Sequence, residues 1–202
     1  MLYFTGDWHL GQPKRKFKEV ATPYKSPREM QESLIENTLA TVTKYDTLFI
    51  VGDFIDCRSD GTFANDFDKI MTIPRQFPCR TVLIIGNNEW RLINEVFNGD
   101  FSKFRNFCLE CGWHNVMTRK VLVQRGRKYV VVHRPDNVSD FVPCIFAHFH
   151  LAGPLLKRGY NVTCYCNFMR PVSFEYILKV LKDADTYWTL PEWDRTLGVR
   201  SW

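Results

Sequence analysis

The sequence contains no apolar run near the roughly 18–20 residues that a membrane-spanning helix needs. It begins without the basic segment and small-residue cleavage site of a secretory signal peptide. Internal repeats, low-complexity segments and linker-like stretches are absent from its 202 residues. We therefore expect one soluble domain over residues 1–202, located in the cytoplasm and not in a membrane.

The cysteines do not form a recognisable framework. Their number is seven, and the only close pairs are Cys108 with Cys111 and Cys164 with Cys166. A structural zinc site needs four ligands at tight spacing, and the sequence offers no second Cys-x-x-Cys pair. Without a secretory signal, we expect buried free thiols in place of disulfides.

Negative charge is in deficit, since 27 Lys and Arg against 22 Asp and Glu leave a net charge of +5. The excess is concentrated at residues 14–18 and 125–128. Such segments are either solvated loops or surfaces that attract a phosphate-bearing substrate. Composition alone leaves both interpretations open.

Hydrophobic patterning predicts strands and helices that alternate along most of the chain, which indicates an α/β protein. Short buried strands are expected at residues 1–5, 47–51, 81–85, 143–146 and 160–168, with a hairpin at 120–132. Helices are expected at 27–44, before Pro74, and at 91–97, 101–111 and 174–181.

Five of these strands end in side chains that commonly bind metals. In chain order they are Asp7 and His9, Asp53, Asn87, His133, and His148 with His150. The sequence has only five histidines, and four of them belong to this set. Because strand ends meet at one edge of a sheet, we expect the seven side chains to converge.

Imidazole and carboxylate ligands favour borderline transition metals such as Mn, Fe, Zn or Ni. In Asp7-x-His9 and in His148-x-His150, both side chains of the pair lie on one face of an extended segment. Seven ligands are too many for one ion with open positions and suit two ions that share a bridging ligand. Two such ions, roughly 3.5–4 Å apart, can hold a bridging hydroxide and support displacement at phosphorus.

The ordered motifs resemble those of the calcineurin-like metallophosphoesterases. They are Asp7-x-His9, Gly52-Asp53-x-x-Asp56, Gly86-Asn87-Asn88-Glu89, His133 and Ala147-His148-x-His150. Residues 161–177 are also similar to the C-terminal end of small bacterial and phage members. The resemblance implies a four-layer α/β/β/α sandwich and phosphoesterase activity with two divalent metal ions, Mn²⁺ foremost.

The resemblance also implies a division of the ligands. Asp7, His9, Asp53 and His150 would bind one metal, whereas Asp53, Asn87, His133 and His148 would bind the other. Asp53 would then bridge the two ions. Asp56 is expected to orient a ligand without binding metal itself.

Two positions depart from the family pattern. Ala147 replaces the usual Gly, and Asn88 replaces the usual His that contacts the phosphate and protonates the leaving group. An Asn can donate a hydrogen bond but cannot act as a general acid, a loss that typically costs ~10²–10⁴ in rate. We expect Asn88, Glu89 and Arg134 to be the catalytic residues beside the metals, Arg134 through contact with a phosphate.

We expect hydrolysis of phosphodiesters of nucleotides or nucleic acid through a metal-bridging hydroxide. The first alternative is a nucleotide phosphomonoesterase. The second is a non-catalytic binding or scaffold protein that keeps the fold, which the replacement at Asn88 would explain. The sequence leaves the oligomeric state open.

Overall fold

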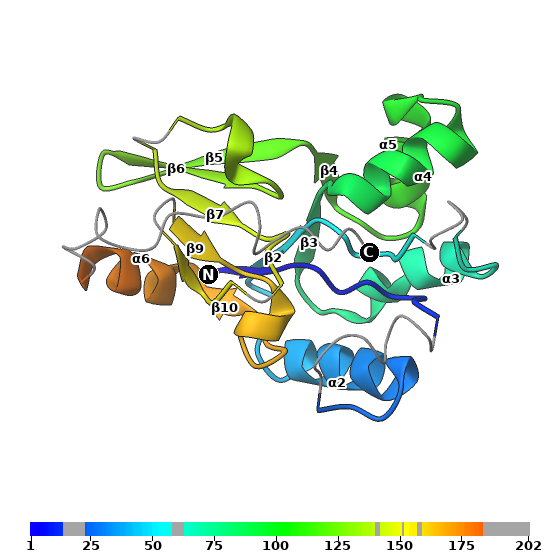
Figure 1. Cartoon of the computed structure of the whole chain (residues 1–202), viewed down its shortest axis with the longest axis horizontal. Helices are drawn as coiled ribbons and strands as arrows, with labels where there is room; N and C mark the ends of the chain where they lie inside the picture. The colour runs from blue at the N-terminus through cyan, green and yellow to red at the C-terminus, as the bar shows by residue number, and fades with distance from the viewer. Residues whose placement is uncertain (14–22, 58–62, 140–141, 151, 157–158, 184–202) are drawn as a thin grey trace.

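The computed structural model describes residues 1–13, 23–57, 63–139, 142–150, 152–156 and 159–183 (Figure 1). The whole basic segment 14–18 and the whole tail after residue 183 lie outside these ranges. Two five-stranded sheets form the centre of the molecule, with helices around them. No helix among the described residues has the length and apolar character to cross a membrane.

The first sheet has the strand order β10-β1-β2-β3-β4. Four parallel strands follow the chain: β1 (Leu2–Thr5), β2 (Thr47–Val51), β3 (Arg80–Ile84) and β4 (Asn115–Met117). The short β10 (Val172–Ser173) pairs antiparallel with β1. The continuous apolar runs of β1, β2 and β3 follow from burial on both faces of this sheet.

The second sheet has the strand order β5-β6-β7-β9-β8. Its strands are β5 (Arg119–Gln124), β6 (Arg127–Val132), β7 (Cys144–Phe146), β8 (Leu155–Leu156) and β9 (Gly159–Asn161). β5 and β6 form the expected hairpin. Its two turn residues, Arg125 and Gly126, both have positive φ, as tight β-hairpin turns require.

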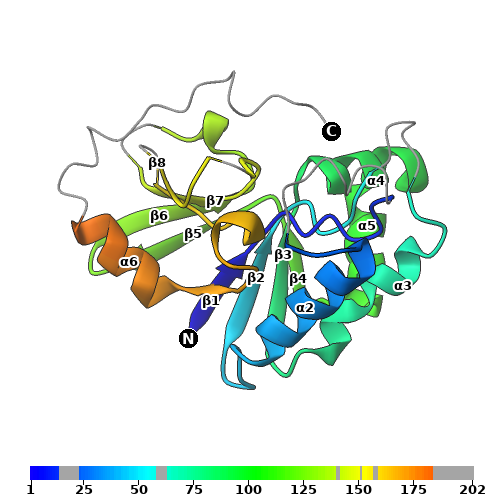
Figure 2. The same cartoon turned by 60° about the horizontal axis from the view of Figure 1, so that its bottom comes forward.

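Helices cover the outer face of the first sheet (Figure 2). They are α2 (Pro27–Leu39), α3 (Phe67–Met71), α4 (Asn87–Phe97) and α5 (Phe101–Glu110). Between the sheets, Phe4, Phe49 and Val51 pack against Val131 and Ile145.

The side of this inter-sheet core is closed by α6 (Phe174–Asp183), which buries Phe174 and Ile177. The outer face of the second sheet is covered by Phe149, Leu156 and their neighbours. The α/β sandwich class predicted from the sequence is therefore confirmed.

Some predicted boundaries were wrong. The helix expected over 27–44 ends at Leu39, because the Asp46 carboxylate accepts the Thr43 N–H at 2.7 Å and holds that segment in a turn. The strand expected over 160–168 is limited to Gly159–Asn161, and a 3₁₀ turn follows at Cys164–Cys166. The helix expected from residue 91 begins four residues earlier, at Asn87, so Asn87 lies in a helical first turn.

Candidate metal centre

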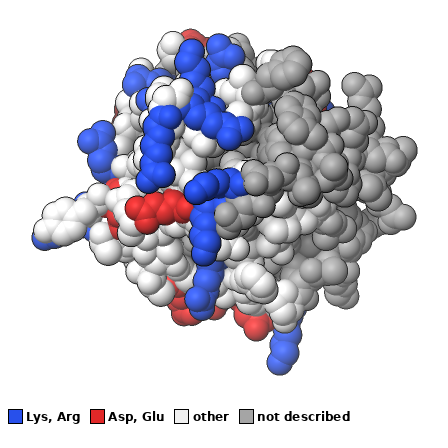
Figure 3. All heavy atoms as spheres, turned by 90° about the vertical axis from the view of Figure 1, so that its left-hand side faces the viewer, with Lys and Arg blue, Asp and Glu red and all other residues white. Residues whose placement is uncertain are grey.

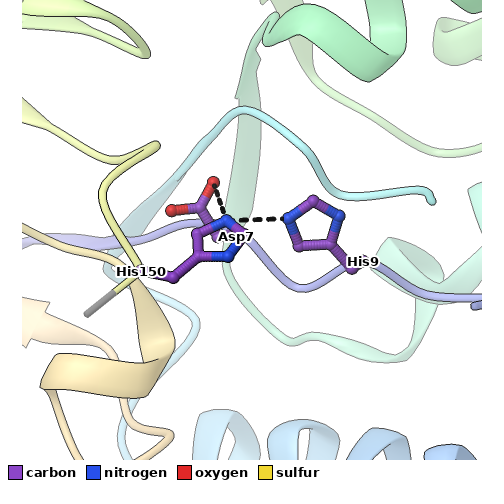
Figure 4. Close-up of side chains that lie close together, drawn as sticks. All are labelled: Asp7, His9 and His150. Carbon is purple, nitrogen blue, oxygen red and sulfur yellow. Dashed lines mark hydrogen bonds and ion pairs between the residues drawn. The ribbon is translucent and has the colours of Figure 1, made fainter. Parts of the chain in front are cut away.

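The C-terminal ends of β1, β2, β6 and β7 bring two groups of potential ligands together. Asp7, His9 and His150 form the first group (Figure 4), and Asp53, His133 and His148 form the second. Within each group, one ligand atom from every residue lies within 4.8 Å of the others. All six residues come from the set that the sequence predicted.

The first group has the spacing of a metal site. His9 Nε2 lies 3.0 Å from His150 Nε2, which in turn lies 3.6 Å from Asp7 Oδ1. Donor atoms at adjacent positions around one ion, each about 2.1 Å from it, are about 3.0 Å apart. Asp7 Oδ1 is buried and accepts no hydrogen bond in the described structure. A cation among these atoms would satisfy that oxygen and separate the two imidazoles.

The second group includes the seventh predicted ligand. His133 Nε2 lies 3.0 Å from Asn87 Oδ1, 3.2 Å from His148 Nδ1 and 3.5 Å from Asp53 Oδ1. The other carboxylate oxygen of Asp53, Oδ2, lies 3.8 Å from His9 Nε2 in the first group. Asp53 therefore directs one oxygen toward each group, as a bridging ligand would.

Hydrogen bonds orient two of the imidazoles. His133 Nδ1 lies 3.0 Å from the Val51 carbonyl oxygen, which can only accept, so Nδ1 carries the proton. His9 Nδ1 lies 3.3 Å from Asp56 Oδ1 and donates in the same way when the carboxylate is ionised. Both rings then present an Nε2 lone pair to a metal, and such contacts typically fix the ring orientation of metal ligands.

The backbone at these positions is unusual. Asp7, His9, Asp53 and His148 have φ values of 56°, 47°, 48° and 78°. The left-handed region is uncommon for residues other than glycine, and such residues concentrate at functional sites. The segments after β1 and β2 are hydrogen-bonded to each other. The Asp7 and His9 N–H groups donate to the Gly52 and Asp53 carbonyls at 3.0 and 2.9 Å.

A glycine permits the close approach of β3 to the loop after β2. A Cβ atom on Gly86 would lie 2.4 Å from Asp53 Oδ1, well inside van der Waals contact. On the other side of the site, a Cβ atom on Gly6 would lie 2.7 Å from that of Ala147. The methyl group of Ala147, where the family pattern has Gly, is therefore accommodated by the glycine opposite it.

The charges of the cluster shift the proton affinities of its members. Burial disfavours the charged form of Asp7, but the His150, His133 and His9 rings lower the pKa of its carboxyl well below the usual range. Burial also opposes protonation of His9, yet its hydrogen bond to Asp56 and the nearby Asp53 and Asp7 raise its pKa to about 9. Burial and the neighbouring His133 lower the pKa of His148 to about 4.

The residues predicted to be catalytic occupy three different environments. Asn88 is buried, and its Nδ2 donates to the Ile55 carbonyl at 3.0 Å and lies 3.2 Å from His9 Nδ1. Glu89 is fully buried, and its carboxylate accepts backbone N–H groups from the loops after β2 and β3. Arg134 is exposed, and its guanidinium pairs with Asp136 through Nη2 at 2.7 Å.

Three buried or half-buried side chains that the sequence did not indicate hydrogen-bond to the backbone near the candidate ligands. Asn161 is fully buried, and its Nδ2 donates to the Phe149 carbonyl, between the two histidines, at 2.7 Å. The thiols of Cys164 and Cys166 donate to the Asp7 and His150 carbonyls at 3.2 and 3.3 Å. No spacing in the sequence connects these residues to the ligands, because the contacts arise only when β9 pairs with β7.

The family model described as calcineurin-like phosphoesterase matches residues 2–180. The chain belongs to this family. Phosphoesterases of this family act on phosphate esters and typically bind divalent metals, and this chain has two groups of side chains that could hold such ions.

Solved structures are similar at low sequence identity. A protein of unknown function from Aquifex aeolicus is 20% identical, with a TM-score of 0.58 over 89% of this chain and 98% of that one. The nuclease MPE from Pseudomonas putida is 18% identical, with a TM-score of 0.44 over 79% of this chain and 65% of that one. The first similarity supports the fold. No curated protein matches the sequence.

Proposed function

We propose that this calcineurin-like phosphoesterase is a dinuclear-metal phosphodiesterase whose substrates are nucleotides or nucleic acids. The position of Asp53 carries the proposal. Its two carboxylate oxygens face His133 at 3.5 Å and His9 at 3.8 Å, so one side chain can link two ions. Mn²⁺ is the metal that we favour, since mixed imidazole and carboxylate ligands suit borderline transition metals.

Each side chain of the cluster has a definable task. One ion would be held by Asp7, His9 and His150. The other would be held by Asn87, His133 and His148, and Asp53 would bind both ions. Two bound divalent ions supply a hydroxide nucleophile near neutral pH and neutralise charge that develops on the phosphoryl group. The Val51 carbonyl and the Asp56 carboxylate accept from Nδ1 of His133 and His9, which would leave Nε2 of each ring available to bind an ion. The exposed Arg134 would contact a phosphoryl oxygen with the N–H groups that Asp136 does not use.

Histidine is not available to protonate the leaving group. Four of the five histidines belong to the two ligand groups, and the fifth, His114, accepts the backbone N–H of Thr81 at 3.1 Å. Asn88 cannot supply a proton, and its amide is engaged by the Ile55 carbonyl. We therefore expect a preference for esters whose leaving group departs without protonation.

The deciding experiment compares an aryl phosphodiester with the matching aryl phosphomonoester, in metal-stripped enzyme and after addition of Mn²⁺. We expect Mn²⁺-dependent turnover that favours the diester, and loss of at least about 10²-fold in Asp53→Asn with its circular dichroism spectrum unchanged. Preference for the monoester would indicate a phosphomonoesterase. Absence of turnover with metal demonstrably bound would indicate a binding protein, because aryl leaving groups need little protonation.

A further inference from the structure

One side of the molecule carries a concentration of exposed cations. Figure 3 shows Lys and Arg side chains gathered on this side. We define the basic face as the exposed cations at the tip of the β5–β6 hairpin and in the second half of α6, which are Arg125, Arg127, Lys128, Lys179 and Lys182. Residues 119–132 contain no Asp or Glu, and the exposed acid described on α6 is Glu175.

These cations are not neutralised within the described structure. None of the five makes an ion pair there, whereas Arg28 pairs with Glu32 at 2.7 Å and Arg134 pairs with Asp136. Unpaired cations grouped on one surface create a positive potential that attracts an anionic partner. Two of the five are Arg, whose planar fork suits phosphate oxygens better than a point charge does.

A cleft of about 240 Å³ lies between the hairpin and α6. Leu122, Val123 and Gln124 of β5 line one side, and Phe174, Glu175 and Leu178 of α6 line the other. Met1 and Leu2 complete the lining. The two walls are held together where the Tyr129 and Phe174 rings meet edge-to-face, 5.5 Å apart. The cations of the basic face therefore flank a concave surface whose lining is partly apolar and includes Glu175.

We propose that the basic face binds single-stranded nucleic acid, separately from the metal centre. Phosphates of the strand would lie along the cations, and an unstacked base would enter the cleft and contact Leu122, Phe174 and Leu178. An anionic membrane would satisfy the cations equally well, but a flat lipid surface cannot enter a concave cleft. The paired bases of a duplex cannot enter it either.

The separation between the two sites decides which substrates would use both. Arg127 begins β6, and His133 directly follows its end, six residues further on. At about 3.3 Å per residue these positions are about 20 Å apart. An oligonucleotide of sufficient length could span that distance, but an aryl phosphodiester could contact the metal centre alone.

Binding can be tested without hydrolysis, by fluorescence anisotropy with labelled 20-nucleotide oligothymidylate in EDTA. The test variant is Arg125→Glu/Lys128→Glu, because neither side chain makes a described contact. The matched control, Lys69→Glu/Arg105→Glu, changes the same charge on α3 and α5, at the opposite end of the molecule in Figure 1. We expect the test variant to bind about tenfold more weakly or worse, and its log–log salt slope to fall by about 1–1.5.

Equal losses in the two variants, or no binding by the unmodified protein, would overturn the proposal. So would stronger binding to phosphatidylcholine vesicles that contain phosphatidylserine than to the oligonucleotide, because that result would indicate a membrane surface. Preferential binding of duplex over single strand would likewise contradict it.

A kinetic comparison rests on the proposed function, whereas the binding measurement does not. With an oligonucleotide substrate, we expect the test variant to raise KM about tenfold at unchanged kcat. Its kcat/KM for an aryl phosphodiester should match that of the control. If the aryl ester is not hydrolysed but the oligonucleotide binds, the proposed function fails and the basic face stands. If the ester is hydrolysed and the oligonucleotide does not bind, the proposed function stands and the proposal for the basic face fails.

Discussion

The Glu89 carboxylate accepts the backbone N–H of Asp53 at 2.9 Å, and the same oxygen accepts the Gly86 N–H at 2.7 Å. Its second oxygen accepts the Phe54 N–H at 2.8 Å. A single side chain in the first turn of α4 thus joins the loop that carries Asp53 to Gly86, the residue directly before Asn87. Burial, together with the charge of Asp53, raises the pKa of Glu89 to about 7.

Glu89→Gln should therefore loosen the metal centre without removing a ligand. One carboxylate oxygen becomes an NH₂ group that must face a backbone N–H, leaving buried donors unsatisfied. We expect a loss of about 2–4 kcal/mol in the free energy of unfolding by urea, and weaker Mn²⁺ binding. Glu95→Gln, at an exposed position of the same helix, is the control. A similar, small change in both variants would refute this role for Glu89.

Asn88→His should change how the rate depends on the leaving group. A histidine could protonate the departing oxygen, which is worth ~10²–10⁴ in rate when the leaving group is poor. We expect a gain of about 10²-fold on alkyl phosphodiesters and little change on a nitrophenyl diester. The measurement is the slope of log kcat/KM against leaving-group pKa. Asn88→Gln is the control and should keep the steep slope of the unmodified enzyme. A uniform change across all esters would contradict the prediction.

Metal binding should release protons from His9. In the metal-free protein burial opposes its protonation, but Asp56, Asp53 and Asp7 raise its pKa to about 9, above an ordinary value near 6.5. This raised pKa stabilises the metal-free fold below pH 6.5, and the stabilisation is lost as the pH rises through about 9. At pH 7 an ion that binds Nε2 must displace a proton.

Calorimetry at pH 7 in buffers of different ionisation enthalpy measures that release directly. We expect about one proton from His9 when the first group binds Mn²⁺, and an affinity that increases with pH up to about 9. Asp56→Asn should lower the pKa of His9 and reduce the number of protons released. Heats that do not depend on the buffer would show that His9 is already neutral.

The seven predicted ligands lie together because their positions follow from local rules. A strand ends where its apolar run meets glycine or a polar residue, and the ends of parallel strands meet at one sheet edge. Asp53 after Val51 and Gly52, and His133 after β6, could be placed in this way before any contact was known. The order of the motifs also sufficed to indicate the family.

The ends of two helices could not be predicted from local sequence patterns. Residues 40–44 keep an apolar spacing that is compatible with a helix, but the Asp46 carboxylate binds the Thr43 N–H and Oγ1, both at 2.7 Å, and the helix ends at Leu39. By contrast, α4 is longer than predicted and begins at Asn87, because the Glu89 carboxylate caps its first turn by accepting the Gly86 N–H. In each case hydrogen bonds to one carboxylate outweigh a small difference in helix propensity.

The sequence by itself determined the type of fold, the family and the residues predicted to bind metal, since periodicity and residue type act within a few positions. Tertiary structure alone decided which oxygen of Asp53 faces which group and which nitrogen of His133 is available to a metal. It also decided that the Asn161 amide donates to the Phe149 carbonyl. These contacts join residues 12 to 82 positions apart. They depend on strand pairing and side-chain packing, which no local pattern encodes.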